Sequence, residues 1–101
     1  MKVTFEAQGT IANIAPKGRF DFNTHRDFRA AYEEALASST VRTIQLDLKE
    51  VDYLDSSALG MLLLLKDKTT PAGRTITIVN SQGSVRQILE VANFGKLFSI
   101  S

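Results

Sequence analysis

The sequence has no cysteine and no tryptophan, and it contains only two prolines and one histidine. Without cysteine the chain can form neither a disulfide nor a thiolate nucleophile, and the usual ligands of structural zinc sites are missing. His, Asp and Glu also do not cluster with the spacing of a metal site. We therefore expect no metal, no cofactor and a reducing compartment.

Long apolar runs and an excess of one charge are missing as well. The longest apolar run, residues 58–65, is less than half of the roughly 20 residues that span a bilayer. The first residues lack the apolar segment and cleavage site of a signal peptide. The net charge is +1, with 12 Lys and Arg scattered among 11 Asp and Glu. We expect a soluble cytoplasmic protein that binds neither nucleic acid nor membrane.

The chain has 101 residues, of which 44% are apolar, and this suffices for one hydrophobic core in a single domain, residues 1–101. The apolar patterns predict strands at residues 2–8, 11–15, 44–48, 75–79 and 97–100, and helices at 25–38, 58–68 and 81–92. The fold class is α/β, with a mixed sheet of four to five strands and about three helices packed against it. The sheet opens with an antiparallel hairpin and continues with parallel strands, and the β-branched strand 75–79 is expected to be covered by helices on both faces.

Two local features lie between the hairpin and the first helix. Pro-Lys-Gly at residues 16–18 is expected to end the second strand, and residues 18–22 are expected to form a loop. Asn23 or Thr24 is expected to cap the helix that follows, with Asp27 as its capping-box partner.

The chain is organised around residues 43–68, where a strand leads through Asp55-Ser56-Ser57 into a Leu-rich helix. Ser and Asp are favoured N-caps, because their oxygens accept hydrogen bonds from the N–H groups of the first turn. A phosphate at this place would meet the same N–H groups and the positive end of the helix dipole. Ser56 and Ser57 are therefore either an N-cap and its neighbour or a phosphorylation site. Asp55 is a second cap or a group that orients the Ser56 hydroxyl, and Asp21 is a turn residue or a carboxylate that faces Ser56.

Apolar side chains go nearly all the way round this helix, because successive residues are about 100° apart. Two core faces fit the pattern: Ala58, Leu62 and Leu65, or Leu59, Leu62 and Leu63. Leu64 lies outside both faces, so we expect an exposed apolar patch near Ser56 that binds a partner or is covered by another helix. Gly60 costs about 1 kcal/mol relative to alanine inside a helix, which suggests the close approach of another backbone from the fold or from a partner.

Enzymatic functions lack their motifs. The Gly-x-Ser-x-Gly elbow and the Gly-x-x-x-x-Gly-Lys-Ser phosphate loop are absent, and His25 cannot be placed near Ser56 from the sequence. A receiver domain phosphorylated on Asp47 is a closer rival, but the N-terminus lacks the paired acidic residues that follow the first strand of that fold. We expect no enzymatic activity.

Residues 55–60, Asp-Ser-Ser-Ala-Leu-Gly, resemble the STAS domain of bacterial anti-sigma factor antagonists when read after the strand 44–48 and Val-Asp-Tyr-Leu at 51–54. The likeness covers almost the whole chain, including Gly-Arg-Phe-Asp at 18–21 and Asn-Phe-Gly-Lys-Leu-Phe at 93–98. It implies a STAS-like fold. STAS domains also occur in anion transporters and sensory complexes, and the lack of a membrane segment favours the free-standing regulatory type.

The resemblance also implies a site and a mechanism. In that family the serine after the aspartate is phosphorylated by a kinase that is often itself the anti-sigma factor, which matches Ser56, with Ser57 as the second choice. Asp21 and Asp55 would lie beside it. The implied partner surface comprises Ser57, Gly60, Met61 and Leu64. Two features depart from the family pattern: Ala58 replaces a common glycine, and Phe-Asp-Phe-Asn at 20–23 replaces a more usual aliphatic residue and its small-residue spacing.

The implied function is that of an anti-sigma factor antagonist in partner switching, a form of bacterial signal transduction and transcription regulation. The unphosphorylated protein would bind an anti-sigma factor with serine kinase activity and release its client. Phosphorylation at Ser56 would switch binding off, and a phosphatase would reset the phosphoprotein. Two alternatives remain open: a small-molecule or nucleotide-binding sensor in which residues 55–57 hold a ligand phosphate, and a structural subunit of a sensory assembly.

Overall fold

The longest strand, β2 (Ile11–Phe20), has three partner strands in the sheet. In the computed structural model, which describes residues 2–100, β1 (Lys2–Gln8) pairs with β2 as the predicted antiparallel hairpin. β3 (Thr43–Asp47) is parallel to the first part of β2, and β4 (Val51–Leu54) is parallel to its last part. The carboxyl ends of β2 and β4 therefore reach the same edge of the sheet.

The remaining strands extend the sheet on the far side of β3. β5 (Thr75–Val79) is parallel to β3, and β6 (Ser99–Ile100) is parallel to β5. The strand order is β1-β2-β3-β5-β6, with β4 paired to β2, and the six strands form one mixed sheet. The predicted fold class is confirmed, and the sheet has more strands than the predicted four to five because β4 was not expected.

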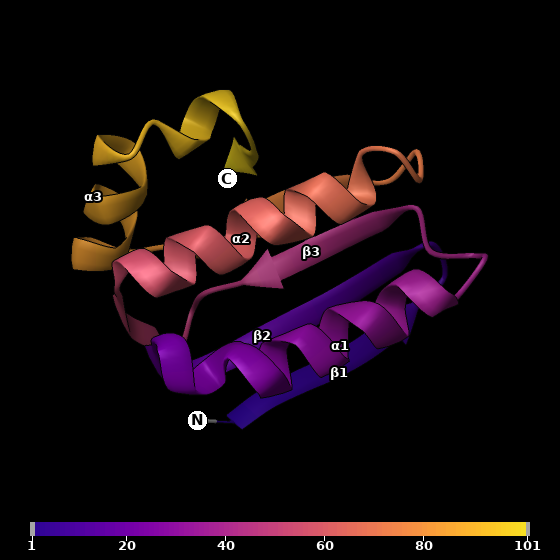
Figure 1. Cartoon of the computed structure of the whole chain (residues 1–101), viewed down its shortest axis with the longest axis horizontal. Helices are drawn as coiled ribbons and strands as arrows, with labels where there is room; N and C mark the ends of the chain where they lie inside the picture. Colours follow the sequence, from indigo (N-terminus) through magenta and orange to yellow (C-terminus); the bar gives the residue numbers. More distant parts are fainter. Residues whose placement is uncertain (1, 101) are drawn as a thin grey trace.

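Three α-helices occur within residues 2–100, as predicted: α1 (His25–Ala37), α2 (Ser56–Thr69) and α3 (Gly83–Val91). Short 3-10 helices precede α1 (η1, Phe22–Thr24) and follow α3 (η2, Phe94–Lys96). α1 and α2 lie side by side across one face of the sheet, while α3 packs beside β4 (Figure 1). Within the described part of the chain, the helices are too short or too polar to cross a membrane.

The hydrophobic core lies between the sheet and its helices. Strand side chains alternate, and the buried ones include Ala12, Ile14, Ile44, Leu46, Ile76 and Ile78. The opposite face is polar and half-exposed: the Gln45 amide donates to Asn13 Oδ1 at 3.0 Å, and the Thr43 and Thr75 hydroxyls lie 3.1 Å apart. The expectation that helices cover both faces of β5 is therefore wrong. A β-branched threonine suits a half-exposed pleated face as well as a buried one.

The expectation that Pro16 ends the second strand is also wrong, because β2 continues to Phe20. Pro16 lies between the last residue paired to β3, Ile14, and the first residue paired to β4, Gly18. A residue without an N–H is tolerated there, since neither parallel neighbour pairs with it. Gly18 adopts a positive φ of 90°, and its N–H donates to the Glu50 carbonyl at 2.8 Å, which starts the pairing with β4.

The unpredicted strand β4 has little sequence pattern. Val51 and Leu54 are buried and the two residues between them are exposed, so the alternation typical of a strand is absent. The register shifts between Gly18 and Arg19 of the partner strand, which is the mark of a β-bulge. A periodicity argument misses a four-residue strand of this kind.

Candidate functional site

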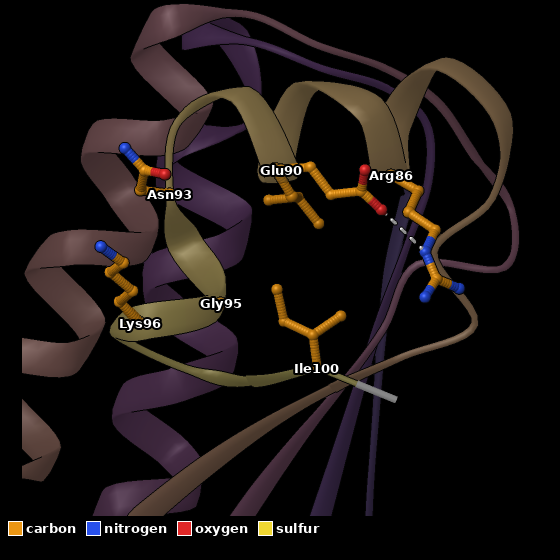
Figure 2. Close-up of a pocket in the computed structure, with 7 residues that line it drawn as sticks. Arg86, Glu90, Asn93, Gly95, Lys96 and Ile100 are labelled. Carbon is orange, nitrogen blue, oxygen red and sulfur yellow. Dashed lines mark hydrogen bonds and ion pairs between the residues drawn. The ribbon is translucent and has the colours of Figure 1, made fainter.

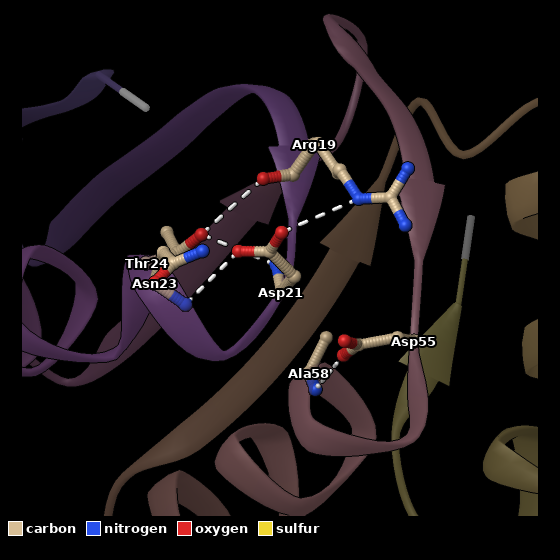
Figure 3. Close-up of polar contacts among 6 residues, drawn as sticks. All are labelled: Arg19, Asp21, Asn23, Thr24, Asp55 and Ala58. Atoms are coloured by element: carbon tan, nitrogen blue, oxygen red, sulfur yellow. Dashed lines mark hydrogen bonds and ion pairs between the residues drawn. The ribbon is translucent and has the colours of Figure 1, made fainter.

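Asp21 and Asp55 follow the ends of two neighbouring strands. The N–H of Asp55 donates to the carbonyl of Phe20 at 3.3 Å, which ties the end of β4 to the end of β2. Each aspartate then begins a helical segment, Asp21 before η1 and Asp55 before α2 (Figure 3). The fold thus brings together two carboxylates that are far apart in the sequence.

Asp55 is the N-cap of α2. Its Oδ1 accepts the N–H of Ala58 at 2.9 Å, so Ser56 is the first residue of the helix and Ser57 the second. Of the alternatives left open by the sequence, the one in which Asp55 caps the helix is confirmed and the one in which Ser56 caps it is wrong, because the aspartate oxygen satisfies the orphan N–H group. Ser56 is exposed and Ser57 half-buried. The hydroxyl of Ser56 is therefore accessible and is not needed as a cap.

Asp21 caps η1 in a reciprocal capping box. Its Oδ1 accepts the N–H of Asn23 at 3.0 Å, and its own N–H donates to Thr24 Oγ1 at 3.2 Å. The Thr24 hydroxyl donates in turn to the carbonyl of Arg19 at 3.3 Å. Thr24 holds the N-cap position of α1, as predicted, but its buried side chain makes no capping hydrogen bond to that helix and serves the strand-to-helix turn, so the expected capping box with Asp27 is wrong. The loop predicted at residues 18–22 is instead the end of β2 and a rigidly capped turn.

Arg19 brings a positive charge to the same surface. Its Nε lies 3.3 Å from Asp21 Oδ2, and its guanidinium lies over the Tyr53 ring, 4.3 Å from the centroid. Arg19 and Tyr53 are paired across β2 and β4, with Phe20 and Leu54 buried on the other side. Neither contact was predicted, because the pairing of β2 with β4 was not.

The exposed face of α2 agrees with one of the two predicted arrangements. Ala58, Leu62 and Leu65 are buried, while Leu63 is 39% and Leu64 48% exposed. Met61, predicted as a partner contact, is only 4% exposed and packs in the core, so its side chain is not available on the surface. For Gly60, no atom among residues 2–100 lies within 4 Å of the place of a Cβ beyond its own turn, so the expected close approach from within the fold is absent.

Two exposed aromatics were missed in the sequence. Phe22 is 70% exposed and stacks on His25, with ring centroids 6.4 Å apart, and Tyr53 is 38% exposed. Both belong to segments that flank the aspartates. The sequence signal for the exposure of Phe22 is its position directly after the capping Asp21. The turn that starts there directs Phe22 away from the core in which Phe20 is buried.

Several hollows lie elsewhere on the chain, and two of them adjoin α3. One, of about 360 Å³, is an apolar groove between α2 and α3 lined by Leu59, Ser84, Gln87, Ile88, Val91 and Ala92. The other, of about 270 Å³, lies between α3 and the final strand, and its wall includes an ion pair of Arg86 with Glu90 at 3.2 Å (Figure 2).

Asp47, the residue of the receiver-domain alternative, accepts hydrogen bonds from Lys49 N–H and the Asn80 amide, and so serves a turn.

Comparison with known proteins shows the family of the chain. The sequence profile described as "Mlab, STAS domain" matches residues 3–99. A STAS-domain containing protein of Pseudomonas aeruginosa (strain UCBPP-PA14) is 47% identical over 95 residues, 94% of this chain and 92% of that protein. The anti-sigma F factor antagonist of Lysinibacillus sphaericus is 29% identical over 79 residues, 77% of this chain and 67% of that protein.

The fold is also that of solved anti-sigma factor antagonists. The structure of SpoIIAA in its unphosphorylated form superposes with a TM-score of 0.77 at 20% identity, covering 99% of this chain and 87% of that one. The phosphorylated form of SpoIIAA, from Bacillus, gives a TM-score of 0.75 at 18% identity over 99% and 91% of the two chains. With a family profile that spans nearly every residue, the chain belongs to the STAS domain family.

Proposed function

We propose that this protein is an anti-sigma factor antagonist whose binding is controlled by phosphorylation of Ser56. In the unphosphorylated state it binds an anti-sigma factor with serine kinase activity and thereby frees the client of that factor. Phosphorylation of Ser56 by the same partner ends the interaction, and a phosphatase restores it. The protein acts as a substrate and a binder, with no catalysis of its own.

The observation that carries the proposal is that Ser56 is an exposed residue at the first position of α2 and that Asp55, not Ser56, caps this helix. A phosphate on that hydroxyl faces the N–H groups and positive dipole end of the helix, so the fold tolerates it. On this proposal Asp55 orients the hydroxyl or helps to hold the metal-bound phosphate donor of a kinase, and Asp21 faces the same hydroxyl. The name of the Lysinibacillus relative, an anti-sigma F factor antagonist, supports the same role.

The partner surface on α2 follows from the exposed face of the helix. Leu63 and Leu64 are exposed apolar side chains on the helix that begins at Ser56, and Gly60 leaves open space on its surface. Ser57 remains a predicted contact at the edge of this surface, and Met61 is replaced by Leu63 because Met61 is buried. Phosphorylation adds about −1.5 to −2 charges beside these apolar groups, and burial of that charge without a partner is costly.

The test combines mass spectrometry with partner capture. The protein purified from its native host is expected to carry one phosphate on Ser56. Ser56→Ala is expected to keep partner binding in a pull-down, and Ser56→Asp is expected to lose it. Ser57→Ala is the control for the site of modification: it removes the neighbouring half-buried hydroxyl and is expected to keep the phosphate on Ser56.

Two results would contradict the proposal. One is a phosphate on Ser57 alone. The other is the absence of phosphate under all growth conditions together with identical captures by the Ala and Asp variants of Ser56. In the second case, nucleotide binding by the isolated protein, measured by calorimetry, distinguishes the ligand-binding sensor.

A further inference from the structure

We propose that Arg19 is the residue that binds the phosphate on Ser56, and that it leaves the carboxylate of Asp21 to do so. This inference rests on the proposed phosphorylation of Ser56. It assigns to Arg19 a phosphate-binding role in the switch: the guanidinium exchanges a carboxylate partner for a phosphate partner.

The strand pairing places Arg19 on the correct surface. Arg19 pairs with Tyr53 across β2 and β4, and the next pair, Phe20 with Leu54, is buried. The residue after each strand keeps an extended backbone, so the alternation of side chains continues and returns it to the side of Arg19 and Tyr53. These residues are Asp21 and Asp55, and Ser56 follows directly. Arg19 thus lies one cross-strand step from the segment that carries the phosphoacceptor.

The present contacts of Arg19 leave its best donors free for a new acceptor. Nε approaches Asp21 Oδ2 at 3.3 Å, and Figure 3 shows the two terminal nitrogens pointing away from that carboxylate. The side chain is 64% exposed, against 20% for Asp21, and the Tyr53 ring supports the guanidinium at 4.3 Å. The guanidinium is held by the Tyr53 ring on one face and by one contact through Nε. It can therefore turn its two terminal nitrogens toward a phosphate at little cost.

Electrostatics favour the exchange. A phosphate on Ser56 lies beside the carboxylates of Asp21 and Asp55, and three anionic groups together repel one another. The phosphate carries about −1.5 to −2 charges and offers three acceptor oxygens, so it competes with a carboxylate that makes one contact to Nε. A bidentate ion pair between Arg19 and the phosphate places a positive charge among these three anionic groups and offsets their repulsion.

The exchange leaves the turn intact. Asp21 uses different oxygens for its two partners: Oδ1 accepts from the N–H of Asn23, and Oδ2 faces Arg19. The loss of Arg19 therefore frees Oδ2 while Oδ1 continues to cap η1. The rearrangement is confined to side chains, which suits a switch that changes the surface and keeps the fold.

The experiment uses full-length protein with phosphoserine installed at position 56 during translation, so that no kinase is needed. Phosphorus NMR titration gives the second pKa of the phosphate, which is about 6 for unperturbed phosphoserine. A cation in contact favours the dianion and lowers this pKa. Arg19→Gln is expected to raise the pKa by about 1 unit relative to the unsubstituted phosphoprotein. Arg19→Lys, which keeps the charge but loses the fork, is expected to raise it less.

The matched control is Arg29→Gln, an arginine of α1 that is similarly exposed and paired to Glu33 at 2.9 Å. This variant is expected to leave the phosphate pKa unchanged. Equal pKa values for Arg19→Gln and the unsubstituted phosphoprotein, with both folded by circular dichroism, would overturn the proposal. Because the phosphate is installed without a kinase, this result is independent of whether the host modifies Ser56. An unmodified Ser56 in the host would defeat the proposed function and leave the Arg19 contact standing.

Discussion

At the scale of single residues, the two aspartates of the site are first of all helix caps. Asp55 holds the start of α2 through Ala58 N–H, and Asp21 holds η1 through Asn23 N–H. A short carboxylate side chain at the N-cap reaches the orphan N–H groups without help from its neighbours. This capping places Ser56 at the first position of α2 with a free, exposed hydroxyl. The capping role of Asp-Ser-Ser and its proposed phosphorylation thus fall on different residues.

The capping role of Asp55 predicts a measurable loss of stability. Asp55→Ala is expected to lower the free energy of unfolding by about 1 kcal/mol, because one N–H group of the first turn loses its acceptor. Asp55→Asn is the control, since asparagine caps as well as aspartate does. Urea unfolding followed by circular dichroism measures both. Equal stability of the Ala variant and the unsubstituted protein would show that Asp55 is not a working cap.

At the scale of elements, α2 divides its apolar side chains between two tasks. One face packs on the sheet with Ala58, Met61, Leu62 and Leu65 buried, and the other leaves Leu63 and Leu64 in contact with solvent. A helix apolar all round is normally buried on all sides, so the exposed leucines on this one support the proposed interaction surface. β4 and α2 meet at Asp55, so this surface is joined directly to the candidate phosphorylation site.

The two faces predict opposite effects for two alanine substitutions. Met61→Ala is expected to lower the free energy of unfolding by about 2 kcal/mol or more, because it leaves a cavity in the core. Leu64→Ala is expected to change it by less than about 0.5 kcal/mol, since the side chain is exposed. Partner affinity should respond in the reverse order, with the larger loss for Leu64→Ala. Urea unfolding and a pull-down on the same two proteins give the comparison, and a destabilised Leu64 variant would assign that side chain to the core.

At the scale of the whole molecule, the site lies on the rim of the fold. Asp21 and Asp55 follow the carboxyl ends of parallel strands, and the core lies behind them between the sheet, α1 and α2. A charge added at the rim meets solvent and a helix N-terminus, not the core. The switch proposed for this protein therefore changes what the surface binds while the domain remains folded.

This arrangement predicts that phosphorylation is neutral or slightly favourable for stability. The free energy of unfolding of the protein with phosphoserine at position 56 is expected to equal that of the unmodified protein or to exceed it by up to about 1 kcal/mol, because the helix dipole favours the negative charge. Urea unfolding of the two forms at low and at high salt tests this, because the favourable part should fade as salt screens it. A loss of 2 kcal/mol or more would mean that the phosphate acts by unfolding α2.

Local pattern was sufficient for most of the fold. Alternation in β1 and the first part of β2, the apolar periodicity of α1 and the β-branched run of β5 each appear in a short window of sequence, and each element was predicted. The strand at residues 51–54 was not, because it lacks alternation and is stabilised by pairing with the distant end of β2. The prediction at Pro16 failed for the same reason: whether a strand tolerates a proline depends on whether a neighbouring strand pairs with that residue.

The sequence by itself determined the α/β class, the presence of an Asp-Ser-Ser helix start and the excess of apolar surface on α2, since these follow from composition and periodicity. Only the tertiary structure decided which face of α2 is buried, because a helix apolar on every side has no preferred face until it packs. Only the tertiary structure brought Arg19, Asp21 and Tyr53 beside Asp55, because the pairing of β2 with β4 joins residues that no local pattern connects.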